Sequence, residues 1–167
     1  MKTYKCGLYG GKFLPFHKGH KYCIEVAAAQ CDRVVVIFFK NSEEEEAILK
    51  DKVIFDRNFL AVKSREESIR NECKKYDNVE FVTLDCKEMH KKANELGIGL
   101  WDSETDYVMD AVGDFQVVYS SEPSYDSYFK RAYPFAEHIL VDVPRKHVPI
   151  SGTKIRMMTK AEGINWL

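Results

Sequence analysis

YKCGLYGGKFLPFHKGHKYCIEVAAAQ, residues 4–30, is the stretch that decides the fold of this chain. Residues 4–9 are apolar enough for a buried strand, and Gly10 and Gly11 end that strand with a sharp turn. Residues 19–30 then have the apolar spacing of a helix. The predicted buried side of this helix consists of Ile24, Val26, Ala27 and Ala28. A strand, a glycine turn and a helix in that order predict the first half of a βαβ unit.

The rest of the chain continues this alternation of strands and helices. The further predicted strands are residues 33–39, 79–84, 115–119 and 138–143, and the further predicted helices are residues 64–75, 101–112 and 153–159. Because strands spaced by helices form parallel sheets with right-handed crossovers, we expect an α/β fold with a Rossmann-like, doubly wound, five-stranded parallel sheet. We expect the 167 residues to form one domain, 1–167, whose ligands bind beyond the carboxyl ends of the strands.

Three short polar stretches mark the ends of predicted elements. Ser42 and the four glutamates after it are typical of a capped helix start or of a loop, and we interpret them as a solvated acidic face. Residues 64–67, SREE, resemble a capping box at the start of a helix. Residues 120–123, SSEP, follow the fourth predicted strand, so that Pro123 is placed to open another helix.

Composition and charge narrow the classes of function. The chain has 25 basic and 26 acidic side chains and a net charge of −1. Because such a chain has no overall positive field, we expect no nucleic acid partner, and any anion must be bound locally. No apolar stretch approaches the ~18 residues of a membrane span, and the N-terminus has no signal-peptide pattern. Five cysteines without a CxxC pair are typical of reduced thiols, so we expect a cytoplasmic protein with no membrane partner.

The loop after the first predicted strand has the features of an anion site. Gly10 and Gly11 let the backbone approach a ligand closely, and Phe13 and Pro15 stiffen the loop. Lys12 adds a positive charge. No Gly-Lys-Ser/Thr follows the glycines, and their spacing is not GxGxxG, so neither of these two phosphate motifs is present.

His17 and His20 stand three residues apart where the following helix begins. That spacing puts both imidazoles on one face, beside the free N–H groups of a helix N-terminus, which favour anions. We interpret the loop as a polyphosphate site whose donors stabilise the charge that develops in phosphoryl transfer. A metal site of His17, His20 and Cys23 is the alternative, although no fourth ligand stands at a recognised spacing.

A second anion site is predicted near the end of the chain, at residues 150–156, ISGTKIR. Ser151 is placed to cap a short helix, which turns the N–H groups of Gly152 and Thr153 outward. Arg156 lies one turn later on the same side, and its planar guanidinium suits a bidentate phosphate contact. Taken alone, the stretch is equally typical of an ordinary capped helix with a solvated arginine.

The two loops together resemble the HxGH nucleotidyltransferase superfamily. Residues 17–20, HKGH, are similar to its first signature, and residues 150–156 are similar to its second. Residues 11–20 resemble, more narrowly, the nicotinamide-nucleotide adenylyltransferase domain of the bifunctional NAD-biosynthesis proteins of NadR type. Supporting matches over nearly the whole chain are residues 120–123, Val141-Asp142 with Arg145, and Leu100-Trp101. That family often has alanine where Gly152 stands, and the P-loop of its kinase half is not in this sequence.

The resemblance implies that ATP and nicotinamide mononucleotide react to give NAD and pyrophosphate, by in-line attack of the acceptor phosphate on the α-phosphorus. It implies catalytic roles for His17, His20, Lys12 and Arg156. Contacts with ATP and its phosphates are implied for Gly10, Gly11, Phe13, Ser151, Gly152, Thr153, Ser121 and Glu122. Contacts with the acceptor are implied for Trp101, Arg65 and Asp142. Mg²⁺ is expected to enter with ATP, with few ligands from the protein.

Some assignments keep an alternative. Trp101 is expected to stack on the cationic pyridine ring, or else to be a plain core residue. Glu122 is expected to contact adenine or ribose, or else to cap a helix. The same fold also transfers nucleotides to phosphopantetheine, FMN, and choline or glycerol phosphates, and a catalytically inactive nucleotide sensor would keep both loops. The expected partners are therefore ATP and a small acceptor, and the sequence leaves room for a homo-oligomer.

Overall fold

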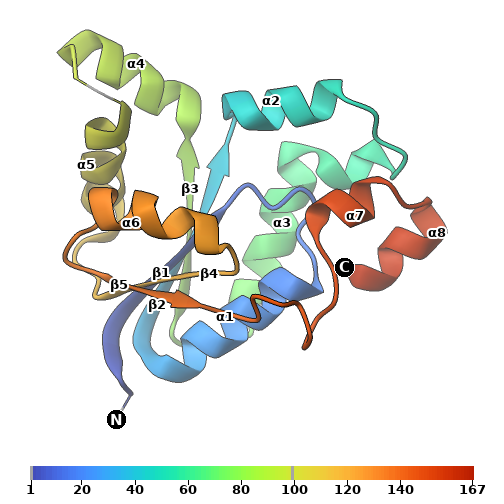
Figure 1. The fold of residues 1–167 in the computed structure, drawn as a ribbon, viewed down its shortest axis with the longest axis horizontal. Helices are drawn as coiled ribbons and strands as arrows, with labels where there is room; N and C mark the ends of the chain where they lie inside the picture. The colour runs from blue at the N-terminus through green and yellow to red at the C-terminus, as the bar shows by residue number, and fades with distance from the viewer. Residues whose placement is uncertain (1, 99) are drawn as a thin grey trace.

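The computed structural model describes residues 2–98 and 100–167, and the side chains of residues 100–103 lie outside its described part. Five strands form one sheet: β1 (Tyr4–Gly11), β2 (Cys31–Lys40), β3 (Val79–Asp85), β4 (Val117–Ser120) and β5 (Glu137–Leu140). Every neighbouring pair is parallel, and the order across the sheet is β3-β2-β1-β4-β5 (Figure 1). The predicted five-stranded, doubly wound parallel sheet is confirmed.

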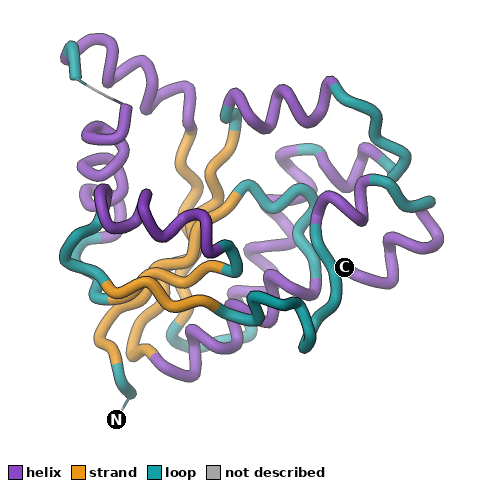
Figure 2. The backbone as a smooth tube through the Cα atoms, in the orientation of Figure 1, coloured by secondary structure: helices purple, strands orange, loops and turns teal. Residues whose placement is uncertain are grey.

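Helices cover both faces of the sheet (Figures 1 and 2). One face carries α1 (Lys18–Gln30) and α3 (Val62–Cys73), and the other carries α5 (Leu100–Val112) and α6 (Asp126–Ala132). The other elements are α2 (Glu43–Lys50), α4 (Cys86–Leu96), α7 (Gly152–Arg156), α8 (Lys160–Gly163), and the 3₁₀ turns η1 (Arg57–Leu60), η2 (Pro123–Tyr125) and η3 (Ile164–Trp166). None of the helices in the described ranges is both long and apolar enough to cross a membrane.

The continuous apolar run of β2 is buried on both faces. Val34, Val36 and Phe38 point into the core beneath α1 and α3, whereas Val35 and Ile37 point into the core beneath α5 and α6. All five side chains are fully buried, which is why the run shows no alternation with polar residues. This strand therefore anchors the sheet whose loops form the site.

The switch point of the sheet lies between β1 and β4. Tyr9 of β1 pairs with Val36 of β2 on one side and with Tyr119 of β4 on the other. The chain continues from β1 to β2 and β3, and then returns to the opposite side of β1 with β4. The loops that follow β1 and β4 therefore diverge, and a crevice opens between them at the carboxyl end of the sheet.

The structure confirms the capped helix start offered for Ser42 and the glutamates, and it corrects two other expectations about polar stretches. The glutamate run forms helix α2, in which the Ser42 hydroxyl accepts the N–H of Glu45. Glu45 is only 2% exposed, and its carboxylate pairs with the buried guanidinium of Arg65. The run is therefore not wholly a solvated acidic face. Helix α3 begins at Val62 with Ala61 as a cap without a side-chain bond, so the capping box expected at 64–67 does not form.

Other differences concern the ends and number of the helices. Pro123 opens η2, as predicted, and α6 follows it. Helix α4 was not predicted, although its buried residues Cys86, Met89 and Ala93 have the i, i+3, i+7 spacing of an amphipathic helix. Strand β5 ends at Leu140 instead of 143, since the chain turns at Asp142, where φ is 49°. Helix α7 ends at Arg156, three residues before the predicted end.

Candidate active site

The candidate active site is a cleft of about 460 Å³ at the carboxyl ends of β1 and β4. It is lined by every residue that the sequence assigns to catalysis or phosphate binding, namely Gly10, Gly11, Lys12, Phe13, His17, His20, Ser121, Glu122, Ser151, Gly152, Thr153 and Arg156. The loop after β1, the turn after β4 and the start of α7 thus meet in one place. Their contact with a ligand stays a prediction.

His17 and His20 form a reciprocal cap at the start of α1. Nδ1 of His17 accepts the N–H of Gly19 at 3.0 Å, and Nδ1 of His20 accepts the N–H of His17 at 3.1 Å. Because Nδ1 accepts in both rings, the proton of each neutral imidazole sits on Nε2. A Cβ at Gly19 would lie 2.8 Å from Cε1 of His17, so only glycine fits between the histidines. The HxGH spacing therefore fixes both tautomers, and each ring offers an Nε2–H donor.

The two imidazoles are also held rigidly and kept neutral. The ring of His20 stacks on that of His17 at 3.7 Å and meets the edge of Phe13 at 4.8 Å. Burial, with Arg145 nearby, lowers the pKa of His17 to about 3. Burial, followed by the charges of His17 and Arg145, also lowers the pKa of His20. At neutral pH both rings are therefore uncharged donors, and the positive charge of the cleft comes from other residues.

The loop after β1, called the first loop below, brings its backbone close to the cleft. A Cβ at Gly10 would lie 2.6 Å from Cε2 of Phe39, so there is no room for a side chain at that position. Phe13 has a φ of 53° and a buried ring, which anchors the loop. Between them, Nζ of Lys12 forms an ion pair of 2.8 Å with Glu44 of α2. The ammonium group thus stands at the mouth of the cleft with a carboxylate that an incoming anion must replace.

The second loop, residues 150–156 at the start of α7, contacts the first loop directly. Ser151 Oγ accepts the N–H of Lys154, which confirms the predicted cap of α7. Nη1 of Arg156 donates to the carbonyl oxygen of Leu14 at 2.7 Å, and Nη2 donates to Oγ1 of Thr153 at 3.2 Å. A Cβ at Gly152 would lie 2.8 Å from the same Leu14 oxygen. The two loops therefore share a tightly packed contact, and the guanidinium of Arg156 is oriented by both.

Arg145 lines the cleft although the sequence did not assign it to the site. Its Nη1 donates to the carbonyl oxygen of Ile150 at 2.8 Å, and its Nη2 lies 3.6 Å from a carboxylate oxygen of Glu122. The residue has a φ of 51°, so the backbone turns sharply there. Its position five residues before Ile150 was the available signal, because a cation that close to the second loop can fold back onto it.

Asp142 organises a turn and does not line the cleft. Its carboxylate accepts the N–H groups of Lys146, His147 and Val148, each at 2.9 Å. These bonds, with those from His147 and Val148 contributing most, lower the pKa of Asp142. The side chain therefore shapes the segment that carries Arg145 toward the cleft.

Arg65 lies beneath the first loop. The residue is 1% exposed, and its Nη1 donates to the carbonyl oxygen of Lys12 at 2.9 Å. Its Nε donates to the carbonyl oxygen of Leu60 at 2.8 Å, and its Nη2 pairs with the buried carboxylate of Glu45. The guanidinium also lies over the ring of Phe38, 5.0 Å from its centre. Arg65 thus supports the loop from inside the molecule and does not line the cleft.

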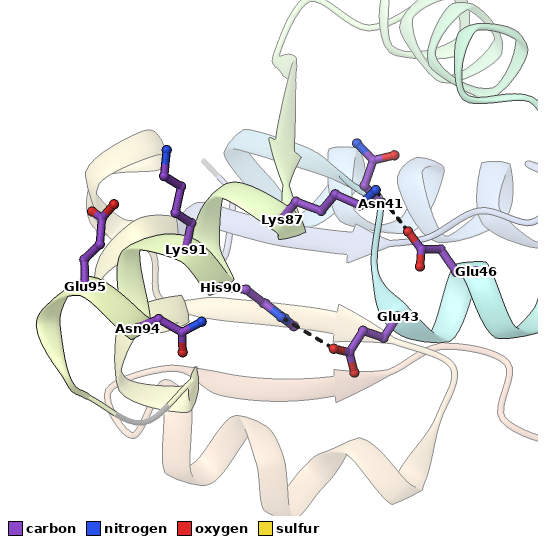
Figure 3. Close-up of a pocket in the computed structure, with 8 residues that line it drawn as sticks. All are labelled: Asn41, Glu43, Glu46, Lys87, His90, Lys91, Asn94 and Glu95. Carbon is purple, nitrogen blue, oxygen red and sulfur yellow. Dashed lines mark ion pairs between the residues drawn. The ribbon is translucent and has the colours of Figure 1, made fainter.

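Helix α2 is tied to α4 as well as to the first loop (Figure 3). Glu46 forms an ion pair of 3.1 Å with Lys87, and Glu43 lies 4.0 Å from Nδ1 of His90. In the groove between the two helices these pairs point toward one another from opposite walls. The helix that carries Glu44 and Glu45 is therefore held on both sides.

A second cavity of about 520 Å³ opens beside the cleft. The two cavities share Gly10, Gly11, Lys12, Glu44 and Tyr125. Its aromatic wall consists of Phe39, Tyr125, Tyr128, Phe129 and Tyr133. Glu104 of α5 also lines it, accepts a hydrogen bond from the Tyr128 hydroxyl, and has its pKa raised by burial. Sequence reasoning missed this wall because helix α6, which supplies Tyr128 and Phe129, has too few residues for a clear period.

Two further sequence expectations remain to be placed. Trp101 belongs to α5, but its side chain lies outside the described part of the structure. For the alternative metal site, Sγ of Cys23 lies 3.4 Å from the hydroxyl oxygen of Ser121, while Nδ1 of His17 and of His20 accept backbone N–H groups. Among the described side chains, those of residues 2–98 and 104–167, no three His, Cys, Asp or Glu are grouped to hold a metal ion.

Known sequences match this chain over most of its length. The sequence profile of the cytidylyltransferase-like family matches residues 8–158. A phosphopantetheine adenylyltransferase of Mycoplasma capricolum subsp. capricolum (strain California kid) is 33% identical over 92 residues. That alignment covers 55% of this chain and 57% of that enzyme.

Solved structures share the fold. A NadR protein in complex with NAD and AMP-PNP has a TM-score of 0.60 at 20% identity, over 93% of this chain and 42% of that one. A bifunctional NMN adenylyltransferase/ADP ribose pyrophosphatase from Francisella tularensis has a TM-score of 0.58 at 19% identity, over 92% and 41% of the two chains. At these identities the likeness is one of fold, and this chain spans about four-tenths of each matched chain.

Proposed function

We propose that this chain, which belongs to the cytidylyltransferase-like family, transfers the adenylyl group of ATP to nicotinamide mononucleotide, with NAD and pyrophosphate as products. The observation that carries the proposal is the contact of the two loops at Leu14, which puts two Nε2–H donors and three cations around one cleft. Such an array of preorganised donors suits the charge that develops on a phosphoryl group in transfer.

In the proposed reaction, the 5′-phosphate of the acceptor attacks the α-phosphorus of ATP in line. The acceptor phosphate is ionised at neutral pH, so the reaction needs positioning and charge stabilisation and no general base. His17 and His20 donate Nε2–H to the oxygens of the transferring phosphate. Lys12 leaves Glu44 and bridges toward the acceptor or the α-phosphate. Arg156, with Ser151 and Thr153, holds the leaving pyrophosphate.

Mg²⁺ is proposed to enter with ATP. The carboxylates that line the cleft are Glu44 and Glu122, and each faces a cation, Lys12 at 2.8 Å and Arg145 at 3.6 Å. The donor set therefore suits a metal ion held mainly by phosphate oxygens, which neutralises part of their charge. Ser121 and Glu122 are proposed to contact the adenosine part of ATP from the turn after β4.

The aromatic and acidic character of the second cavity supports nicotinamide mononucleotide as the acceptor. A pyridinium ring is attracted both to aromatic faces and to the carboxylate of Glu104. Stacking by Trp101 stays a prediction. For Arg65 and Asp142 we propose positioning roles, since Arg65 holds the carbonyl of Lys12 and Asp142 shapes the segment of Arg145.

Phosphopantetheine is the second candidate acceptor, because the curated relative at 33% identity is a phosphopantetheine adenylyltransferase. An incubation with ATP, Mg²⁺ and one acceptor at a time, followed by release of pyrophosphate, decides between them. We expect turnover with nicotinamide mononucleotide and little with phosphopantetheine, FMN, choline phosphate or glycerol phosphate. Turnover with phosphopantetheine alone would reassign the acceptor. No pyrophosphate with any acceptor would favour a nucleotide sensor over an enzyme that uses ATP.

A further inference from the structure

A serine, a histidine and an aspartate from three different elements form a hydrogen-bonded chain beside the cleft. Nε2 of His138 in β5 lies 2.6 Å from Oγ of Ser120, the last residue of β4. Nδ1 of His138 lies 3.2 Å from Oδ1 of Asp126, the first residue of α6. The side chain of His138 is 4% exposed, and the ring of Phe129 meets it edge-on at 4.7 Å.

The parallel register explains why these residues meet. Val118 pairs with His138, and Ser120 pairs with Leu140, so the side chains of Val118, Ser120 and His138 lie on one face of the sheet. That face is the one covered by α5 and α6, since Val118 belongs to the core beneath them. His138 is therefore enclosed between the end of β4 and the start of α6.

The direction of each hydrogen bond follows from the acceptors. Lys130 and His138 lower the pKa of Asp126, so its carboxylate is ionised and accepts. In the neutral imidazole, Nδ1–H then donates to Asp126, and Nε2 accepts the hydroxyl proton of Ser120. The Ser120 oxygen in turn accepts the backbone N–H of Glu122 at 3.3 Å. The chain of bonds thus runs from the turn after β4 to the start of α6 without a gap.

The two ends of this chain belong to the two cavities. Ser120 lines the cleft together with Ser121 and Glu122. Helix α6, which begins at Asp126, carries Tyr128 and Phe129 into the wall of the second cavity. A displacement of the turn by a bound nucleotide thus has two routes to the aromatic wall, the backbone through η2 and the buried imidazole of His138.

We propose that Asp126, His138 and Ser120 form a positioning relay, which transmits occupancy of the nucleotide cleft to helix α6 and thereby fixes the wall of the acceptor cavity. The relay rests on the proposed function only in naming the first cavity the ATP cleft. His138 touches neither substrate in this scheme, so it is a positioning residue. Its expected effect is coupling, in which one nucleotide raises the affinity for the other.

Hydrogen exchange of the α6 amides, with the β,γ-imido analogue of ATP as the only ligand, tests the relay. In the wild type we expect the analogue to slow exchange at residues 126–132 by about fivefold or more. In His138→Phe, which keeps a ring but loses both bonds, the analogue should still bind and the slowing should disappear. Lys130→Ala is the matched control, because Lys130 pairs with the same carboxylate from its exposed side, 2.8 Å away, and leaves the relay whole.

Several outcomes would overturn the relay. No slowing in the wild type, or equal slowing in His138→Phe, would show that the imidazole transmits nothing. Loss of thermal stability in His138→Phe without loss of the slowing would make the trio a purely structural network. Stoichiometric labelling of Ser120 by a fluorophosphonate would make the trio a nucleophile with its base. Failure of the proposed acceptor chemistry would appear separately, as absence of pyrophosphate release, and would leave this exchange measurement interpretable.

Discussion

The carbonyl oxygen of Leu14 accepts a hydrogen bond of 2.7 Å from Nη1 of Arg156, a residue 142 positions later in the chain. Gly152 packs against the same oxygen, so both ends of the sequence meet at one backbone atom. The orientation of Arg156 is thus set by the protein before any anion arrives. Such preorganisation reduces the reorganisation that binding and transfer require.

Gly152→Ala should loosen this contact. A Cβ there would lie 2.8 Å from the Leu14 oxygen and 3.2 Å from Nη1 of Arg156, so α7 must move away from the first loop. We expect a loss of about 1–3 kcal/mol in the free energy of unfolding, as is usual for overpacking. We also expect a raised KM for ATP. Denaturant unfolding and steady-state kinetics measure both, and unchanged values would mean that the two loops move apart without cost.

His17→Asn should separate capping from catalysis. Asparagine is a strong N-cap residue, so stability should stay near that of the wild type, whereas loss of Nε2–H should lower turnover by roughly a hundredfold. His17→Ala loses the cap too and should cost about 1 kcal/mol more in unfolding free energy. His20→Ala should lower turnover by a similar factor. Near-normal kcat in His17→Asn would remove its Nε2 from charge stabilisation.

The fold should become less stable below pH 6.5. The pKa of His17 is about 3 in the folded chain, against about 6.5 when unfolded, so the unfolded state binds the proton more tightly. Stability from this source is complete above pH 6.5 and falls as the pH drops toward 3, by up to about 1.4 kcal/mol per pH unit. Denaturant unfolding between pH 7 and pH 5 measures the slope. His17→Asn should flatten it, and an equal slope in the variant would contradict the assignment.

Glu104→Gln tests how the acceptor cavity selects its ring. A buried carboxylate should disfavour nicotinic acid mononucleotide, which carries a carboxylate where nicotinamide mononucleotide carries an amide. The wild type should prefer the amide, and the variant, which keeps shape and hydrogen bonding, should lose about tenfold of that preference in kcat/KM. A ratio that does not change would place the ring away from Glu104.

Removal of Arg65 alone should destabilise the fold more than removal of Arg65 and Glu45 together. Arg65→Met leaves a buried carboxylate without its partner, and losses of about 3–5 kcal/mol are typical of such a change. The double variant Arg65→Met/Glu45→Leu should be more stable than Arg65→Met, since no lone charge remains. Turnover in the double variant should still fall, because the Lys12 carbonyl has lost its support. If the loss of stability in the double variant equalled the sum of the losses in the Arg65→Met and Glu45→Leu variants, the pairing would be contradicted.

The strands and both loops of the cleft could be predicted because their signals are local. Five apolar runs, two glycines after β1, and the capped stretch at Ser151 each depend on neighbours in sequence. Three-residue spacing of His17 and His20 was enough to place both rings on one helix start. Their reciprocal cap and fixed tautomers were not predicted and are seen only in the structure.

Residues whose roles depend on a distant partner or on the exact path of a turn were not predictable in the same way. Glu45 looks like any other glutamate of its run, and its buried carboxylate pairs with Arg65, 20 positions away. Asp142 was expected to contact the acceptor, yet three backbone N–H groups occupy its carboxylate. Arg145 enters the cleft from a turn in which its own φ is positive, and its position five residues before Ile150 was the one signal in the sequence.

The run from Glu43 to Glu46 has one further consequence, which concerns insertions and deletions. Each of its four identical letters has a different partner, at His90, Lys12, Arg65 and Lys87. Adding or removing one glutamate would leave composition and local propensity almost unchanged, yet it would rotate the rest of α2 by about 100°. Counted from the Ser42 cap, an added glutamate would leave carboxylates at positions 43–46, but Ala47, Ile48 and the residues after them would turn away from their present neighbours. A stretch that reads as low complexity is in this chain intolerant of slippage, and natural length variation should fall on either side of it.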